Sequence, residues 1–295
     1  EATSDQQSNE LNNLTEQESF ELAEVLKRKL AEQETPESDQ ASIQQMIRGL
    51  GDHRGALRLT FAQSLGNVGE EAIPYLCDAL KNDPNVIIRR ASAKTLNLIG
   101  SKKALPNLVD AFKTDQDPVV QGSSAGAMAT IGEPAIDELL KILVDPGCTA
   151  FQVGLINLAL SFIGAKAPDA FNQATLSENI EIRIAAITVL AEQIQARTNS
   201  SAKKALLNAL SDDASEVRAE AATMAGKTLE PEDASNQLCT MLRDESDQVR
   251  KNTSLALMKM EATNAIERIK DAINTETNEQ VKSVMTVAVN VLEKG

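Results

Sequence analysis

The stretch Asn85-Val-Ile-Ile-Arg-Arg-Ala-Ser-Ala-Lys-Thr-Leu-Asn-Leu-Ile-Gly100 decides the fold of this chain. It follows the breaker Asn82-Asp83-Pro84, it is rich in alanine and aliphatic residues at helical spacing, and it ends in glycine. Breaker residues that cap a helix at its start and a glycine that ends it are typical of a helix-turn-helix hairpin. The stretch therefore predicts the second helix of such a hairpin.

The aliphatic–basic pair Ile88-Arg89 recurs along the chain about every 32 residues. Each copy follows a shorter apolar stripe and a breaker, and each hairpin leaves an apolar face that only its neighbour can cover, so the hairpins must stack. The sequence predicts an all-α HEAT-like α-solenoid of about eight helical hairpins over residues 41–295. The register runs through Leu57-Arg58, Ile88-Arg89, Val120-Gln121, Val153-Gly154, Ile182-Arg183, Val217-Arg218, Val249-Arg250 and Val281-Lys282.

Residues 1–40 differ from the repeats and form a separate polar segment in this prediction. Residues 1–13 are polar and are expected to be disordered. Thr15 and Glu18 have the spacing of a capping box, and apolar residues from Leu22 to Leu30 make one stripe across the helix that follows. We expect this helix to cap the end of the solenoid, and residues 32–39 to be a linker.

The composition excludes several classes of partner. The net charge is −14, with 43 acidic residues against 29 lysines and arginines, so nucleic acid and anionic membranes are not expected as ligands. No apolar stretch approaches ~20 residues, so no membrane span is predicted. One histidine and three widely separated cysteines cannot assemble a zinc site, and no metal is expected.

The cysteines also bear on the compartment. Unpaired cysteines indicate a reducing environment, so we expect a cytoplasmic protein. The chain does not begin with Met, which leaves open the plastid stroma after removal of a transit peptide. We expect Cys77 and Cys239 to be core residues and Cys148, in a turn, to be the most reactive of the three.

The recurring arginines have a structural interpretation. In stacked helical hairpins, an arginine after the aliphatic anchor pairs with an aspartate of the adjacent repeat and fixes the stacking angle. We predict such a ladder at Arg58, Arg89, Arg183, Arg218 and Arg250.

The second helices carry the candidate binding strip. In such stacks they line the concave wall, and the second and sixth residues after each anchor are expected to be exposed there. From Gly122 to Thr223 these positions carry no charge. Glycine inside a helix costs about 1 kcal/mol relative to alanine, so Gly122 and Gly126 indicate either a ligand close to the backbone or tight packing on the next repeat. The candidate binding residues of this strip are Arg90, Lys94, Gly122, Gly126, Leu155 and Ala159.

The turn before Leu57 holds the only histidine, His53, beside Arg54. Histidine exchanges a proton near neutral pH and arginine binds carboxylates, although a solvated polar turn explains the same residues. The sequence lacks the motifs of serine hydrolases, P-loop nucleotidases and zinc proteases. Catalytic residues are therefore not assigned.

Residues 85–100, together with 51–69 (GDHRGALRLTFAQSLGNVG) and 119–132 (VVQGSSAGAMATIG), resemble the cyanobacterial HEAT-repeat proteins of the phycobilisome lyase group. That group includes bilin lyases of the paired E and F type, which attach a linear tetrapyrrole to a phycobiliprotein cysteine through a thioether. It also includes relatives that act in bilin removal or phycobilisome turnover. If this chain is an enzyme, the resemblance implies a bilin lyase.

The resemblance implies a role in phycobiliprotein biogenesis, with a phycobiliprotein subunit or a second HEAT-repeat subunit as partner and a bound phycobilin as the one ligand expected. A bilin is flat and apolar and bears two propionates. In this hypothesis Gly122 and Gly126 form the floor beneath its rings, while Arg90 or Arg54 pairs with a propionate. The alternatives are a non-catalytic scaffold that grips a protein segment and a turnover factor that detaches the chromophore.

Overall fold

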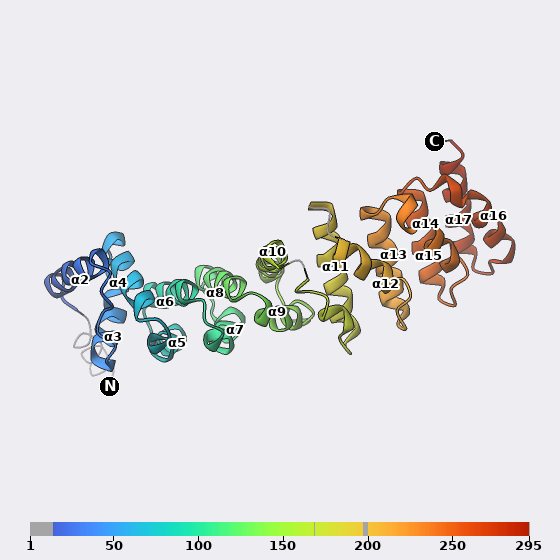
Figure 1. Cartoon of the computed structure of the whole chain (residues 1–295). Coiled ribbons are helices and arrows are strands. Elements are labelled where there is room, and N and C mark those ends of the chain that lie inside the picture. Colours follow the sequence, from blue (N-terminus) through green and yellow to red (C-terminus); the bar gives the residue numbers. More distant parts are fainter. Residues whose placement is uncertain (1–13, 168, 197–199, 295) are drawn as a thin grey trace, which may run out of the picture. The chain divides into compact units, whose positions relative to one another are not determined.

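The computed structural model describes residues 14–167, 169–196 and 200–294, and every regular element among them is a helix. The all-α prediction is confirmed for this part of the chain. The chain divides into two compact units, Glu1–Ala135 (unit 1) and Ile136–Gly295 (unit 2). Both are built from antiparallel helical hairpins (Figure 1). The expected disorder of residues 1–13 lies outside the described residues.

Unit 1 consists of one preceding helix and three hairpins. In each hairpin a shorter first helix is followed by a longer second helix, and the second helices α4, α6 and α8 pack side by side (Figure 1). Short 3₁₀ turns lead into α5, α7 and α9. The helices are α2 (Glu16–Ala31), α3 (Gln40–Gly49), α4 (Gly55–Val68), α5 (Ile73–Asn82), α6 (Val86–Ile99), α7 (Leu105–Thr114) and α8 (Pro118–Ile131).

Unit 2 contains the remaining repeats. Its helices are α9 (Ile136–Leu143), α10 (Ala150–Lys166), α11 (Ile180–Ala196), α12 (Ser200–Ala209), α13 (Ser215–Thr228), α14 (Pro231–Met241), α15 (Asp247–Lys259), α16 (Ile266–Thr275) and α17 (Glu279–Leu292). The repeat that ends in α11 departs from the predicted pattern. Among its described residues, a short 3₁₀ turn at Ala174–Leu176 stands where the other repeats have a first helix.

The second helices α6 and α8 begin where the sequence supplies a side-chain cap. Asn85 and Asp117 accept hydrogen bonds from the first free backbone N–H groups of α6 and α8, which otherwise lack partners. Pro118 occupies the first turn of α8, where a missing N–H costs nothing. At the far end of α6, Gly100 adopts the left-handed conformation with φ of 65°, which suits glycine.

The core is built from small and branched residues in both units, with alanine, leucine and isoleucine predominating. Three phenylalanines are fully buried, Phe61 and Phe112 in unit 1 and Phe171 in unit 2. Small residues allow neighbouring second helices to approach closely. The clearest case is Gly226 in α13, where an added Cβ would lie 2.6 Å from the Cα of Ala256 in α15.

The α2 helix belongs to unit 1 and packs against α4. Its predicted capping box is present, since Thr15 Oγ1 accepts from the Glu18 backbone N–H at 3.2 Å and the Thr15 N–H donates to Glu18 Oε2 at 2.8 Å. Ser19 Oγ, which is buried, donates to Asp52 Oδ2 in the α3–α4 turn at 2.7 Å. The structure therefore joins the described residues of the 1–40 segment to the first repeat.

Candidate ligand-binding surface

The exposed positions of α4, α6 and α8 form one continuous part of the predicted strip, and all of it lies in unit 1. Leu59, Gln63 and Lys94 are exposed, while Arg90, Gly122 and Gly126 are partly exposed. Because α6 packs against both α4 and α8, these six residues lie on adjacent helices. We call this surface the unit-1 floor.

Gly126 is not required by packing within the unit. A Cβ built there meets one side chain at ordinary contact distance, the Nδ2 atom of Asn97 at 3.8 Å. An alanine would therefore fit without displacing any neighbour. Tight packing within unit 1 therefore does not explain this glycine. The other explanation, open space over the helix backbone for a ligand, agrees with the structure.

Arg90 does not offer the free guanidinium that the sequence suggested. Its Nε and Nη2 atoms donate to the two carboxylate oxygens of Asp117 at 2.9 and 2.6 Å, so α6 is clamped to the start of α8. This bidentate pair lowers the pKa of Asp117 to about 2, since hydrogen bonds from Arg90 favour the charged carboxylate. The prediction that Arg90 is available to a ligand carboxylate is wrong in this structure.

Arg54 is occupied in the same way. Its Nε and Nη2 donate to the two oxygens of Asp52 at 2.9 and 2.7 Å, and Nη2 also donates to the Glu16 carbonyl at 3.0 Å. These bonds hold the pKa of the Asp52 carboxyl well below its usual range. His53 is exposed, with Nδ1 3.8 Å from Asp52 Oδ1. This cluster ties α2 to the α3–α4 turn, and it lies on a turn and not on the helical surface of the floor.

Of the candidate cations Arg54, Arg90 and Lys94, only Lys94 has no carboxylate partner among the described residues. It is exposed on α6 and forms no ion pair with the described residues. It occupies the same register on α6 as Gly126 does on α8. Because a lysine ammonium on a long stem reaches several positions around its helix, Lys94 can serve a ligand anion placed over either glycine.

The other half of the predicted strip lies on α10 in unit 2, and there the prediction was partly wrong. Leu155 is half-buried, whereas Ala159 is only 4% exposed. Its neighbour Leu158 is 70% exposed. The buried stripe of α10 is therefore displaced along the sequence by one residue from that of α8, on which Ala125 is buried and Gly126 is partly exposed. The register that placed residues correctly on α6 and α8 fails by one residue on α10.

Sequence reasoning missed the exposed apolar residues Phe151, Leu158 and Phe162 of α10. A signal for them was present in the sequence. At the fifth and ninth positions after the anchor, α4, α8 and α13 carry alanine or glycine, whereas α10 carries leucine and phenylalanine.

The arginine ladder is present at four of its five predicted positions. Each of these arginines donates through two nitrogens to one carboxylate of the next repeat and through Nη1 to a backbone carbonyl six residues earlier. The pairs are Arg89–Asp115, Arg183–Asp212, Arg218–Asp244 and Arg250–Glu276. These residues stabilise the stack and do not face a ligand.

Arg58 departs from this ladder. It donates to the Asp52 carbonyl, but Asp83, the carboxylate of the next repeat, pairs with Arg48 of α3 at 3.0 Å. Gln121 retains the carbonyl bond of the ladder, since its Nε2 donates to the Asp115 carbonyl at 2.7 Å. Gln121 and Gly154, which lack the basic residue, stand on either side of the division between the units.

The cysteines do not form a reactive centre. Cys77 and Cys239 are buried and Cys148 is half-buried, all as free thiols. Burial raises the pKa of each thiol, to about 11 for Cys77. The described residues contain no cluster of histidine, cysteine and carboxylate side chains able to hold a metal ion. Nor does any described helix have the length and apolar character needed to cross a membrane.

Comparison with known proteins gives the family. HEAT repeats match residues 11–97, 43–129, 73–147, 167–254 and 204–290. The bilin biosynthesis protein MpeU of Synechococcus sp. (strain WH8020) is 60% identical over 291 residues, which is 99% of this chain and 98% of that protein. The chain belongs to this HEAT-repeat family. The resemblance to cyanobacterial HEAT-repeat proteins of bilin metabolism is thereby confirmed.

Solved structures of HEAT-repeat family members and other proteins are much more distant. The complex of CpcE and CpcF of phycocyanin lyase from Nostoc sp. PCC7120 is 17% identical, covers 86% of this chain and 96% of that chain, and has a TM-score of 0.34. Human deoxyhypusine hydroxylase is 20% identical, covers 86% and 97%, and has a TM-score of 0.37. These values are too low for a functional argument, which rests on the sequence relative.

Proposed function

We propose that the chain is a phycobiliprotein maturation factor that binds a phycobiliprotein subunit and holds a bilin on the unit-1 floor. The observation that carries this proposal is the 60% identity, over essentially the whole length of both chains, with a bilin biosynthesis protein. The match spans every repeat of the chain, including those that contain α4, α6 and α8.

The unit-1 floor supports the proposal through its chemistry. A bilin presents flat pyrrole rings, which require close approach to a small-residue surface, and two propionates, which require a cation. Gly126 leaves the backbone of α8 open, and Lys94 is exposed on the adjacent helix. Because internal aspartates already occupy Arg90 and Arg54, we assign the propionate to Lys94 in place of these arginines.

The binding step is tested by mixing the purified chain with a bilin and recording its absorption spectrum. Binding is expected to shift and intensify the long-wavelength band. Gly122→Leu should abolish this change while the helical circular dichroism persists, because a leucine side chain fills the floor. Gly154→Leu is the control, since this exposed glycine lies on α10, outside the unit-1 floor, and has no atom within 4 Å of an added Cβ. Equal binding by both variants would remove the floor from the proposal.

The direction of the chemistry is tested separately with a phycobiliprotein subunit. Starting from the bilin-free subunit, a bilin that remains bound after denaturation indicates attachment through a thioether. Starting from the bilin-carrying subunit, loss of its colour indicates detachment. A complex with neither change indicates a scaffold.

A further inference from the structure

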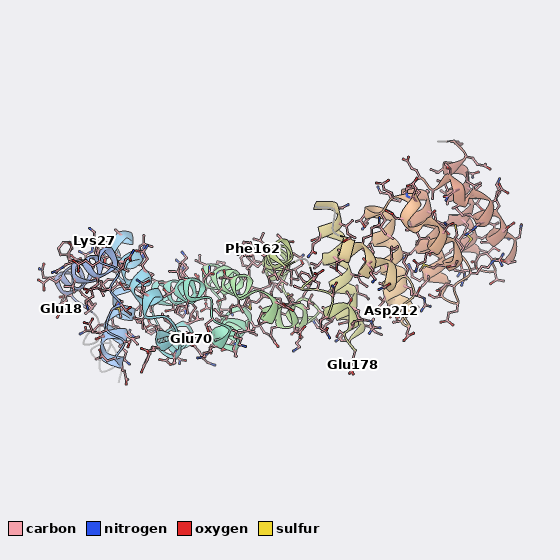
Figure 2. The ribbon with its side chains drawn as sticks, viewed as in Figure 1. Glu18, Lys27, Glu70, Phe162, Glu178 and Asp212 are labelled. Carbon is pink, nitrogen blue, oxygen red and sulfur yellow. The ribbon has the colours of Figure 1, made fainter. Side chains whose placement is uncertain are left out.

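The α10 helix of unit 2 presents a row of large apolar side chains to solvent. Phe151 is 51% exposed, Leu158 is 70% exposed and Phe162 is 44% exposed, with Leu155 half-buried between them. Figure 2 marks Phe162 on this helix. Exposed apolar residues scattered singly are ordinary, whereas a contiguous row marks an interaction site. We call these four residues the α10 seam.

Leu158 and Phe162 stand at the fifth and ninth positions after the sequence anchor Val153, although burial on α10 follows a register one residue away from that anchor. In α13 the equivalent residues are Ala222 and Gly226, both buried, and Gly226 lies directly against Ala256 of α15. On α10 the close contact with the following repeat is made instead at Gly164, where an added Cβ would clash with Gln193 of α11. The repeat that follows α10 also lacks a regular first helix among its described residues. The exposed side chains of the α10 seam therefore do not contribute to the packing of α10 on the following repeat.

The spacing of the α10 seam fits another helix. Its residues follow one another at intervals of four, three and four, which is the a/d pattern of a coiled-coil seam. At 1.5 Å per residue the row extends about 16 Å along one face. Gly154 lies beside it, exposed and with nothing within 4 Å of an added Cβ, so a second backbone can approach closely.

A single charged residue distinguishes the two ends of the α10 seam. The 17 residues of α10 include one charged side chain, Lys166 at its C-terminal end, in a chain of net charge −14. The Lys166 Nζ atom lies 4.3 Å from the centroid of the Phe162 ring, a cation–π distance. A partner with an acidic residue near one end of its apolar row would be oriented by this lysine.

We propose that the α10 seam is a docking site for an amphipathic α-helix of the partner protein, which packs apolar residues at heptad spacing on Phe151, Leu155, Leu158 and Phe162 and places a carboxylate beside Lys166. This proposal rests on the proposed function only for the choice of partner, a phycobiliprotein subunit. The site deepens that function because it holds the protein on unit 2, while the bilin is assigned to unit 1.

Two other occupants fit the α10 seam less well. A bilin needs a surface broad enough for its rings, such as the three adjacent helices of the unit-1 floor, whereas the α10 seam is the face of one helix. A second copy of the chain would bring together two molecules of charge −14. It would also pair α10 with another α10, which has no carboxylate to meet Lys166.

The test measures the affinity of the full chain for a bilin-free phycobiliprotein subunit. Leu158→Asp is expected to weaken binding by at least about 30-fold, because it places a charge at the centre of an apolar contact. Lys166→Glu is expected to weaken it about tenfold at low salt and less at high salt. Val291→Asp is the matched control, since Val291 is 48% exposed on α17, and it should bind as the unmodified chain does.

A second measurement locates the contact directly. In the Cys148→Ser background, Leu158→Cys provides one accessible thiol, because Cys77 and Cys239 are buried. This thiol should react readily with a maleimide in the free chain and become protected in the complex. The same variant reports unfolding, since reaction at the buried cysteines would accompany it.

The outcomes are distinct. A complex whose affinity is unchanged by Leu158→Asp, or that leaves the Leu158→Cys thiol reactive, overturns the docking site and leaves the proposed function intact. Bilin binding without any complex also overturns the site. Failure to bind either bilin or subunit overturns the proposed function together with its protein partner. A homodimer that Leu158→Asp dissociates would assign the seam to a second copy of the chain and overturn the proposal.

Discussion

Two glycines inside second helices, Gly126 of α8 and Gly226 of α13, have opposite surroundings. A Cβ at Gly226 would lie 2.6 Å from the Cα of Ala256 and 3.0 Å from its carbonyl oxygen. A Cβ at Gly126 would meet Asn97 Nδ2 alone, at 3.8 Å. The first glycine is required by the contact between α13 and α15, whereas the fold of unit 1 does not require the second.

The ladder shows a related difference. In unit 2, Arg183, Arg218 and Arg250 each bind a carboxylate of the next repeat. In unit 1 the first ladder arginine, Arg58, binds a backbone carbonyl alone. Repeats from α11 onward are therefore held by both close helix packing and buried ion pairs. The α6–α8 contact is also held by ion pairs, Arg89–Asp115 and Arg90–Asp117. It therefore differs from the α13–α15 contact in its open glycine and not in its ion pairs.

Arg250→Ala should produce the largest effect on stability. It removes the partner of Glu276, whose side chain is 2% exposed, and an unpaired buried carboxylate costs about 3 kcal/mol. Urea unfolding followed by circular dichroism measures the loss. Arg58→Ala is the matched control at the same ladder position and should cost about 1 kcal/mol, the net contribution of one hydrogen bond. Equal losses would show that the ladder contributes similarly in both units.

Gly226→Ala tests the packed side of the glycine comparison. The new methyl group must displace the backbone of α15, and overpacking of this kind costs about 2 kcal/mol, partly offset by the better helix propensity of alanine. The measurement is again urea unfolding, with Gly154→Ala as control, because nothing lies within 4 Å of a Cβ there. A variant as stable as the control would mean that α13 and α15 can separate without loss.

Much of this fold follows from sequence, because helix hairpins of similar length repeat with one register. The breakers, caps and terminal glycines of α6 and α8 are local features, and local features locate helices. The repeat that ends in α11 was not predicted correctly, because the register of anchors continues through Ile182 although the described residues before α11 form a 3₁₀ turn in place of a first helix. An anchor spacing reports the second helix and carries no information about the first.

The candidate site was less predictable, for a physical reason that Arg90 illustrates. Sequence identifies a cation on the floor, but whether it is free depends on a carboxylate 27 residues later, Asp117. The same holds for Arg54, although its partner Asp52 is close in sequence. Ala159 was misplaced because a rotation of α10 by a fraction of a turn exchanges its exposure with that of Leu158. Pairing and rotation are tertiary properties.

Gly126→Ala tests the open side of the comparison. Since an alanine fits without a clash, the substitution should stabilise unit 1 by up to about 1 kcal/mol through helix propensity. The chain has one tyrosine, Tyr75, and no tryptophan, so tyrosine fluorescence during urea unfolding reports on unit 1. Bilin binding should weaken in the same variant, because the methyl group occupies the floor. A variant that is less stable would show that packing does require this glycine.

Asp117→Asn should give the smallest effect, and its pH dependence identifies the cause. Asparagine still accepts hydrogen bonds from the backbone N–H groups of Val119 and Val120, so the helix cap is kept and the ion pair with Arg90 is lost. The pKa of Asp117 is lowered from 3.8 to about 2, so the pair stabilises the folded state above pH 4 and this contribution disappears as pH falls toward 2. Unfolding followed by Tyr75 fluorescence should therefore show the unmodified chain to be the more stable at pH 7, and most of the difference should be lost as pH falls from 4 to 2. A difference that does not shrink between pH 4 and pH 2 would have to come from the cap, because over this range the Asp117 carboxyl protonates and Arg90 loses its charged partner.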